Sequence, residues 1–360
     1  MTDNRTGSTG KPVKLSCRNV WKVYGDLPDR FSKGDGFKGD SDEGAADLRT
    51  KGCIPAAVDV SFDIHEGEIF VIMGLSGSGK STMIRCLSRL VDPTHGEILL
   101  DGTDILAVSP SELVELRRHK MGMVFQDFGL LPHMSVLENV AFPLKVQGIG
   151  EDDRRRRAAE MIELVGLKGR EDAYPRQLSG GQQQRVGIAR SLAVEPELWF
   201  LDEPFSALDP LIRRQMQDEF LRLQKMLNKT IVFITHDFLE ALKLADRIAI
   251  MKDGAVVQIA PPSEIVLNPA TDYVAEFTKD APVSRILRIE DVMEAPDGDL
   301  DRSHRTGPNE TLEDVIARFA VSDSRPIAVV DDADNVVGMV TIDRISRGLS
   351  GDGAERPTAS

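Results

Sequence analysis

A glycine-rich run at residues 74–82 holds the side chains best suited to chemistry in this sequence. It fits the pattern G-x-x-x-x-G-K-[ST], in which backbone N–H groups turn inward around the phosphates of a nucleotide. Lys80 is placed to reach the β- and γ-phosphates, and the Ser81 hydroxyl is placed to coordinate Mg²⁺. The residues predicted to hold the phosphates are Gly74, Ser76, Gly77, Gly79, Lys80, Ser81 and Thr82.

A strand and a helix must flank such a loop. Residues 68–73 form a short apolar run rich in β-branched and aromatic side chains, which predicts a buried strand. Residues 81–87 carry apolar side chains at helical spacing. The alternative is an ordinary glycine-rich turn, and the placing of Lys80 and Ser81 directly after the glycines disfavours it.

A pair of carboxylates supplies the second half of the predicted site. Asp202 and Glu203 directly follow the apolar residues 198–201, as at the end of a buried strand. Asp202 would hold Mg²⁺ opposite Ser81, and Glu203 would polarise the attacking water. The alternative is two acids in an ordinary surface loop.

Composition limits the class of protein. The 360 residues contain 44 basic and 58 acidic side chains, a formal charge of −14, which argues against a general nucleic-acid binder. The three cysteines lack metal-ligand spacing and suit a reducing cytoplasm. We find no apolar signal segment and no apolar run of about 20 residues, so work at a membrane requires another chain for the span.

Along the chain, residues 13–20 predict an edge strand, and residues 26–56 predict a polar insertion rich in Gly, Asp, Lys and Ser. Residues 134–194 are predicted to be mostly helical, followed by strands at 198–201 and 231–234 and by a helix at 210–227. The composition changes near residue 280. Residues 281–360 hold 16 acidic residues, 9 arginines and no lysine.

Further motifs make the sequence resemble the ATP-binding subunits of ABC transporters over nearly all of residues 13–278. Residues 178–182, Leu-Ser-Gly-Gly-Gln, match the signature motif of that family, and residues 206–209 match its D-loop. Gln126 matches the Q-loop and His236 the switch histidine. Tyr24 stands where the family has an aromatic side chain that stacks on adenine.

The resemblance implies an α/β fold, a P-loop NTPase of the ABC ATPase type at residues 12–280 with a helical signature subdomain at about 127–190. It implies an ATPase that uses ATP and Mg²⁺, in a homodimer that binds each ATP between two copies. The implied catalytic residues are Glu203, His236 and Gln126, and the implied Mg²⁺ ligands are Ser81, Gln126 and Asp202. ATP would contact Tyr24 and the phosphate loop of one copy, and Ser179, Gly180, Gly181, Gln182 and Asp209 of the other.

Within that family, residues 67–82, 132–137 and 202–213 look like the importers for glycine betaine and proline betaine. The resemblance implies a subunit at the cytoplasmic face of the cell membrane, working with a permease and, through it, a solute-binding protein. Choline or another quaternary amine is the alternative solute. Apolar residues in the segment 128–143 are either core or, as the family uses this region, a docking groove for the permease.

Residues 285–349 resemble a single CBS motif, which implies a small α+β module, and residues 350–360 predict a disordered tail. Whether the module binds a nucleotide or is a purely structural cap stays open. Two other classes are disfavoured. A soluble ABC ATPase of DNA repair or translation would carry long coiled coils or two ATPase domains. A P-loop GTPase would need an Asp after Asn228 and Lys229, where Ile231 stands.

Overall fold

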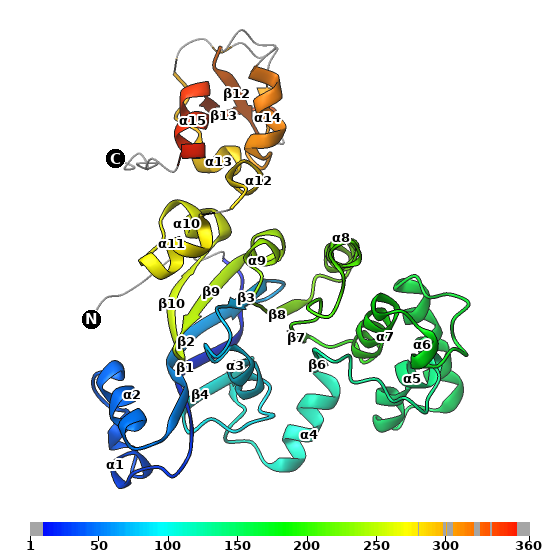
Figure 1. Cartoon of the computed structure of the whole chain (residues 1–360). Helices are drawn as coiled ribbons and strands as arrows, with labels where there is room; N and C mark the ends of the chain where they lie inside the picture. Colours follow the sequence, from blue (N-terminus) through cyan, green and yellow to red (C-terminus); the bar gives the residue numbers. More distant parts are fainter. Residues whose placement is uncertain are drawn as a thin grey trace. The chain divides into compact units, whose positions relative to one another are not determined.

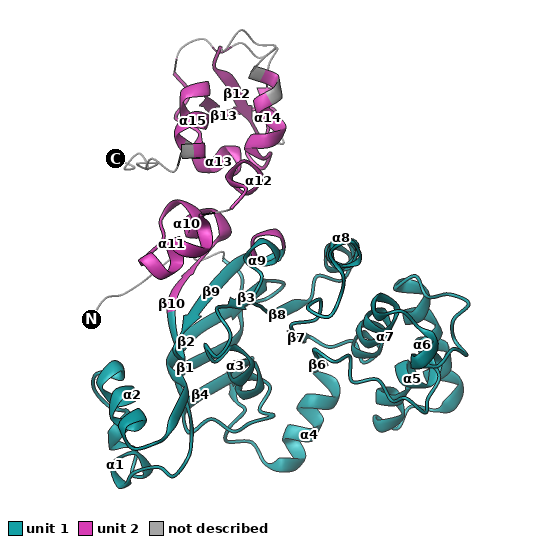
Figure 2. Cartoon of the chain, viewed as in Figure 1, with its two compact units in different colours: residues 1–240, 244–256 teal, residues 241–243, 257–360 magenta. Residues whose placement is uncertain are grey.

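The computed structural model describes residues 10–279, 281–297, 300, 305–319, 325–331 and 333–350. The chain divides into a larger unit, residues 1–240 and 244–256, and a smaller unit, residues 241–243 and 257–360 (Figure 2). This division lies N-terminal to the change in composition near residue 280, because the segment after residue 256 groups with the elements that follow it. The predicted tail at 351–360 lies outside the described residues.

Short apolar runs of the sequence build a parallel sheet in the larger unit, with strand order β9-β3-β8-β7-β6 (Figure 1). The strands are β3 (Ile69–Met73), β6 (Met121–Val124), β7 (Leu198–Asp202), β8 (Thr230–Thr235) and β9 (Arg247–Lys252). Every residue of β3, β7 and β8 is buried, as expected for parallel strands covered on both faces. The parallel direction brings the C-terminal ends of β3, β7 and β8 to one edge.

A second, antiparallel sheet has the order β2-β1-β4-β5. Its strands are β1 (Val13–Tyr24), β2 (Ile54–His65), β4 (His95–Leu100) and β5 (Thr103–Asp104). The prediction of an edge strand at residues 13–20 is wrong, since β1 pairs with β2 on one side and β4 on the other. Leu15, Cys17 and Val20 are fully buried, so this strand is central.

Helices follow the strands of the larger unit: α3 (Lys80–Leu87), α4 (Pro110–His119), α8 (Pro210–Leu227) and α9 (Phe238–Leu244), the last of which has residues 241–243 in the smaller unit. Ser109 caps α4 in a reciprocal capping box with Glu112. An aromatic cluster lies where α8 meets the sheet, because Phe220 packs within about 6 Å of the rings of Phe205, Phe233 and Trp199. Trp199 also donates a hydrogen bond from Nε1 to the Ser191 hydroxyl.

The predicted helical region contains α5 (Val136–Val146), α6 (Glu151–Leu164), the 3₁₀ turn η2 (Pro175–Gln177) and α7 (Gly180–Leu192). Helix α5 packs against both α6 and α7. Ser135 caps α5 with the same capping box that Ser109 makes for α4. Figure 1 shows these helices together, away from α3.

The insertion at residues 26–56 is structured, with α1 (Asp29–Ser32), the 3₁₀ turn η1 (Asp35–Phe37) and α2 (Ser41–Thr50). Its few apolar residues form a small core with β1: Phe31 and Leu48 are buried, and the Phe37 ring lies 5.3 Å from that of Trp21. The polar residues that dominate the composition of this segment lie mainly on its surface, and its few apolar residues lie in the core. These short helices are stable because they share a core with the strand.

The smaller unit contains α10 (Pro262–Leu267), α11 (Asp272–Thr278), α12 (Val283–Ile286), α13 (Ile289–Val292), β11 (Arg305–Thr306), α14 (Leu312–Phe319), β12 (Ile327–Val330), β13 (Val336–Val340) and α15 (Ile342–Ser350). The boundary with the larger unit falls inside β10 (Ala255–Ala260). Strands β11, β12 and β13 form one sheet. Its core includes Leu287, Leu312 and Val329, and Leu267 packs against it.

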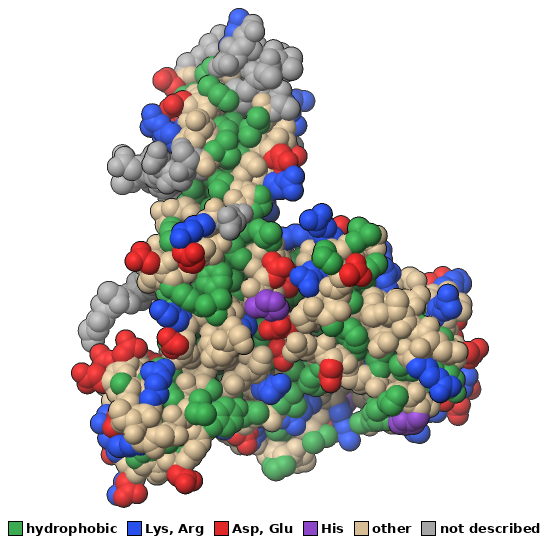
Figure 3. Space-filling model, in the orientation of Figure 1, with side chains coloured by type: hydrophobic (Ala, Val, Ile, Leu, Met, Phe, Trp, Pro, Cys, Tyr) green, Lys and Arg blue, Asp and Glu red, His purple; other side chains and the backbone are tan. Residues whose placement is uncertain are grey.

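Charged side chains of both signs are intermingled on the face of the larger unit shown in Figure 3, without a broad basic area on that face. No helix within the described ranges is long and apolar enough to cross a membrane.

Candidate nucleotide-binding site

The glycine loop connects β3 to α3 and depends on its glycines. Gly74 has φ of +152°, and a Cβ atom there would lie 2.2 Å from the carbonyl oxygen of Met251. Gly79 has φ of +98°, and its Cβ atom would lie 2.1 Å from the carbonyl oxygen of Ala56. Neither position accepts another residue without moving the backbone. The glycines therefore let the loop pass close to neighbouring strands.

Lys80 begins α3, and its ammonium lies inside the curve of the loop. Nζ donates hydrogen bonds to the carbonyl oxygens of Gly74 at 2.8 Å and Leu75 at 2.9 Å. The residue is only 5% exposed, and this burial lowers the pKa of Lys80, while the carboxylates of Glu203 and Asp202 act in the opposite direction. A cation held at a helix N-terminus next to inward-facing N–H groups is suited to a phosphate.

Ser81 and Asp202 come from different elements and meet at the edge of the sheet. The Ser81 hydroxyl donates to Asp202 Oδ1 at 3.3 Å. Asp202 is 4% exposed, and burial raises the pKa of its carboxyl, with Arg85 and the Ser81 hydroxyl opposing the shift. A buried carboxylate beside a hydroxyl is a pair of hard oxygen donors that fits Mg²⁺.

The described residues contain no cluster of three or more His, Cys, Asp or Glu side chains that could enclose a metal ion. In phosphate sites Mg²⁺ is usually bound by one or two protein groups together with phosphate oxygens and water. The donor pair of Ser81 and Asp202 therefore fits a cation that arrives with a nucleotide.

The side chains of Glu203 and His236 form a direct carboxylate–imidazole contact. Asp202 pairs with Ile234 in the register of β7 and β8, so the residues that follow both strands leave the sheet side by side. Glu203 Oε2 lies 2.9 Å from His236 Nδ1. The backbone of Glu203 is left-handed, with φ of +46°, and its N–H donates to the Ile234 carbonyl oxygen. A carboxylate oriented by an imidazole can act as a general base toward water.

Gln126 and Tyr24 are exposed residues at or near the ends of strands. Gln126 is exposed and follows β6, which runs parallel to β7, so it leaves the sheet at the same edge as Asp202. Tyr24 ends β1 and is 41% exposed, with the Lys22 ammonium 5.1 Å from its ring centre. The ring is therefore accessible to a planar ligand.

The signature residues do not join the phosphate loop of their own chain. Ser179 is the N-cap of α7: its hydroxyl accepts from the N–H of Gln182, and the Gln182 side chain accepts from the N–H of Ser179. Gly180 and Gly181 follow in the first turn. Figure 1 shows α7 apart from α3. Asp209 is likewise an N-cap, of α8, accepting from the N–H of Ile212 at 3.2 Å. Both helix N-termini are exposed.

The backbone of the segment 128–143 is fixed by hydrogen bonds from two side chains, while some of its own side chains are exposed. Asn139 is fully buried and donates to the carbonyl oxygens of Leu131, Met134 and Ser135. Arg190 of α7 donates to those of Phe128 and Gly129. Val136 and Val140 are core residues whereas Phe142 is exposed, so the core use is present in part and docking stays a prediction.

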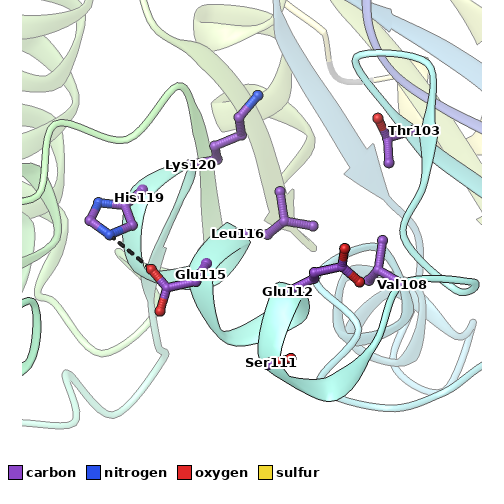
Figure 4. A pocket seen from close by; sticks show the side chains of 8 residues that line it. All are labelled: Thr103, Val108, Ser111, Glu112, Glu115, Leu116, His119 and Lys120. Carbon is purple, nitrogen blue, oxygen red and sulfur yellow. Dashed lines mark ion pairs between the residues drawn. The ribbon is translucent and has the colours of Figure 1, made fainter.

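A hollow of about 610 Å³ lies along α4, apart from these residues (Figure 4). It is lined by Thr103, Val108, Ser111, Glu112, Glu115, Leu116, His119 and Lys120. His119 pairs with Glu115 at 3.3 Å. No residue of the predicted nucleotide site lines this hollow.

Two residues that contact the site loops, Arg213 and Asp237, have no role predicted from the sequence. Arg213 binds backbone carbonyl oxygens in residues 205–208 and the side chain of Asp237, next to His236. Only their positions in the sequence could have indicated a role: Arg213 lies four residues after Asp209, and Asp237 directly follows His236.

Comparison with known proteins shows the family of the chain. A model of the ABC transporter family matches residues 57–206. The trimethylamine N-oxide transport system ATP-binding protein TmoW of Pelagibacter ubique is 53% identical over 326 residues, covering 91% of this chain and 94% of that protein. The glycine betaine/proline betaine transport system ATP-binding protein ProV of Salmonella typhimurium is 45% identical over 340 residues, covering 94% and 83%. A dimeric ATP-binding cassette bound to ADP and Pi has a similar structure, with a TM-score of 0.57 and 35% identity over 69% of this chain and 98% of that one.

Proposed function

Because the chain belongs to the ATP-binding subunits of ABC transporters, we propose that it powers the import of a small solute with a methylated nitrogen. It is an ATPase, and ATP hydrolysis by such subunits is coupled to transport. Trimethylamine N-oxide is our first candidate solute, ahead of glycine betaine, since the TmoW relative is 53% identical and ProV 45%. This changes the order expected from the sequence, where glycine betaine and proline betaine came first.

The contact between Glu203 and His236 is the observation that carries the catalytic part of the proposal. The loop N–H groups and Lys80 bind the ATP phosphates, and Tyr24 stacks on the adenine. Ser81, Asp202 and Gln126 would hold Mg²⁺, which would neutralise charge on the phosphates. Glu203 accepts a proton from the attacking water, and His236 keeps the carboxylate in place and faces the γ-phosphate.

The exposed signature turn supports a homodimer. Ser179, Gly180, Gly181 and Gln182 lie at a helix N-terminus, where backbone N–H groups favour an anion. Since this turn lies apart from α3 in its own chain, we assign it, with Asp209, to the ATP of a second copy (Figure 1). The similar solved structure bound to ADP and Pi is dimeric.

The segment 128–143 is the proposed docking site of a permease. A solute-binding protein delivers the solute to that permease. Because the chain docks on a membrane protein, it is peripheral to the membrane. Leu131 is partly exposed, and its backbone is fixed by Asn139. Leu131→Asp should prevent coupled transport while ATP binding persists, because a charge replaces an apolar contact. Glu160→Gln, on the exposed part of α6, is the matched control. Normal assembly and transport by the Leu131 variant would contradict this docking site.

The decisive experiment is transport. The subunit, its permease and its binding protein are reconstituted in vesicles, and ATP-driven uptake of labelled trimethylamine N-oxide, glycine betaine and choline is compared. We expect saturable uptake of trimethylamine N-oxide that Glu203→Gln abolishes. Uptake of choline alone would refute the proposed order of solutes, and absence of ATP-dependent uptake of all three would refute the importer.

A further inference from the structure

Arg213, in the first turn of α8, contacts two loops of the nucleotide site at once. Its Nε donates to the carbonyl oxygen of Phe205 at 3.2 Å. Its Nη2 donates to the carbonyl oxygens of Ser206 and Leu208, both at 3.3 Å. Its Nη1 lies 3.4 Å from Asp237 Oδ2. A single guanidinium therefore holds three backbone groups of one loop and a side chain of another.

The first of these loops is the turn after β7, which leads from Glu203 to Asp209. The hydroxyl and the N–H of Ser206 both donate to the carbonyl oxygen of Glu203, at 2.9 and 3.2 Å. Phe205 is buried in the aromatic cluster with Phe220 and Phe233. The turn is thus anchored at its start, and Arg213 fixes the direction of the carbonyl groups before Asp209.

The second loop joins β8 to α9. Asp237 follows His236, and its N–H donates to the Thr235 hydroxyl at 3.0 Å. Asp237 Oδ1 accepts from the N–H of Glu240 at the start of α9, which leaves Oδ2 facing Arg213. The Asp237 side chain therefore connects the start of α9 to Arg213 at the position directly after His236.

These contacts close a ring. It runs from Glu203 to His236 by the side-chain contact, along the chain to Asp237, across to Arg213, to the Ser206 carbonyl and back to Glu203. We propose that Arg213 is a positioning residue that couples the turn 205–208 to the placement of His236 against Glu203. The proposal rests on the roles given to Glu203 and His236 in the proposed function. The new element is a physical connection through which the turn before Asp209, which would face the second copy of the chain, affects ATP hydrolysis.

The residue type supports this role. Guanidinium is planar and carries five donors in a fixed arrangement, whereas the ammonium of lysine is a point charge. The Arg213 and Asp237 side chains are 27% and 33% exposed, so this ion pair alone contributes little to stability. The three hydrogen bonds to backbone carbonyl oxygens and the contact with Asp237 fix the geometry of two loops, and this positioning matters more than the stability that the ion pair contributes.

The test uses the full-length chain with four variants: Arg213→Ala, Arg213→Lys, Asp237→Asn and the double variant Arg213→Ala/Asp237→Asn. Arg214→Ala is the matched control, since Arg214 is exposed and has no ion pair within the described part of the chain. For each we measure kcat, KM, equilibrium ATP binding and the thermal unfolding midpoint. Kinetics are measured well below the lowest midpoint, so that loss of folded protein does not enter kcat.

We expect kcat of Arg213→Ala to fall about 10- to 100-fold, the range for a misplaced catalytic group, while ATP affinity is kept. Arg213→Lys should recover part of this loss, and the double variant should be no slower than the slower single variant, because both act on one contact. The inference is wrong if Arg213→Ala keeps full kcat, if its ATP affinity falls in parallel, or if the two losses multiply. A wild-type chain without ATP hydrolysis would instead refute the proposed function.

Discussion

The described residues of the two units differ in whether charged side chains are buried. In the larger unit Lys80 and Asp202 are 5% and 4% exposed, and burial displaces the pKa of both. In the smaller unit the described side chains of Arg285 and Arg318 are exposed and pair with the carboxylates of Glu313 and Glu310. Exposed pairs contribute about 0–1 kcal/mol, whereas a buried charge is costly. Burial of charge therefore distinguishes the larger unit among the described residues, whereas exposed ion pairs such as Arg156 with Glu160 and Arg285 with Glu313 occur in both units.

The largest expected effect lies in the larger unit. Glu203→Gln should reduce kcat by about 10²- to 10⁴-fold, because a positioned general base contributes that much. ATP binding should persist, and two copies should stay together around the bound ATP, which light scattering with ATP and Mg²⁺ would detect. Glu43→Gln, an exposed residue of α2, is the control. A monomer at saturating ATP would count against the composite site.

A core change in the smaller unit should affect stability without affecting chemistry. Leu312 is fully buried, and Leu312→Ala should destabilise that unit by about 2–5 kcal/mol through lost contacts and a cavity. Calorimetry would show the shift, and kcat of the full chain should not change. Val337→Ala, at an exposed position of β13, provides the comparison. If kcat fell together with the stability of this unit, the contrast between the units would not hold.

Lys80→Ala should weaken ATP binding about 10- to 100-fold, since a hydrogen bond to a charged group contributes about 1.5–3 kcal/mol. The change removes the cation that the loop encloses at the carbonyl oxygens of Gly74 and Leu75. Titration with a fluorescent ATP analogue measures the affinity, and Lys33→Ala, an exposed residue, serves as control. Unchanged affinity would exclude Lys80 as a phosphate ligand.

The smallest expected effect concerns pH. Burial raises the pKa of Asp202, so the native chain binds this proton more tightly than the unfolded chain does. The resulting stabilisation is complete below the unfolded value of 3.8 and is lost as pH rises through the raised native value. Asp202→Asn should therefore raise the unfolding midpoint of the nucleotide-free protein at neutral pH and remove the stabilisation by MgATP. Asp172→Asn, at an exposed site, should do neither.

The elements of the nucleotide site were predictable because the parallel sheet imposes their order. Apolar runs at 69–73, 198–201 and 231–234 end at one edge, so the residues after them come together whatever the loops between them do. The contacts of Ser81 with Asp202 and of Glu203 with His236 agree with that expectation. The ABC ATPase fold is confirmed by the family match and by the solved structure. The roles of the individual side chains stay predictions.

Features that depend on distant partners were missed. The central position of β1 follows from pairing with β4, which local alternation of residues does not reveal. The small core of the insertion joins Phe31 and Leu48 to Trp21, and no local period connects them. Arg213 reads as one of many charged residues on a helix until its contacts with residues 205–208 and Asp237 are seen.

The burial of both tryptophans gives the molecule two built-in optical probes. Trp21 packs against Phe37 of the insertion, and Trp199 lies in β7 with its indole N–H bound to Ser191. The sequence has no third tryptophan, so replacing either one by Phe leaves an emission signal from a single place. Trp21 lies three residues before Tyr24, and its emission would report on the packing of the insertion against β1. The Trp199 signal would report on the sheet three residues before Asp202, without any attached dye.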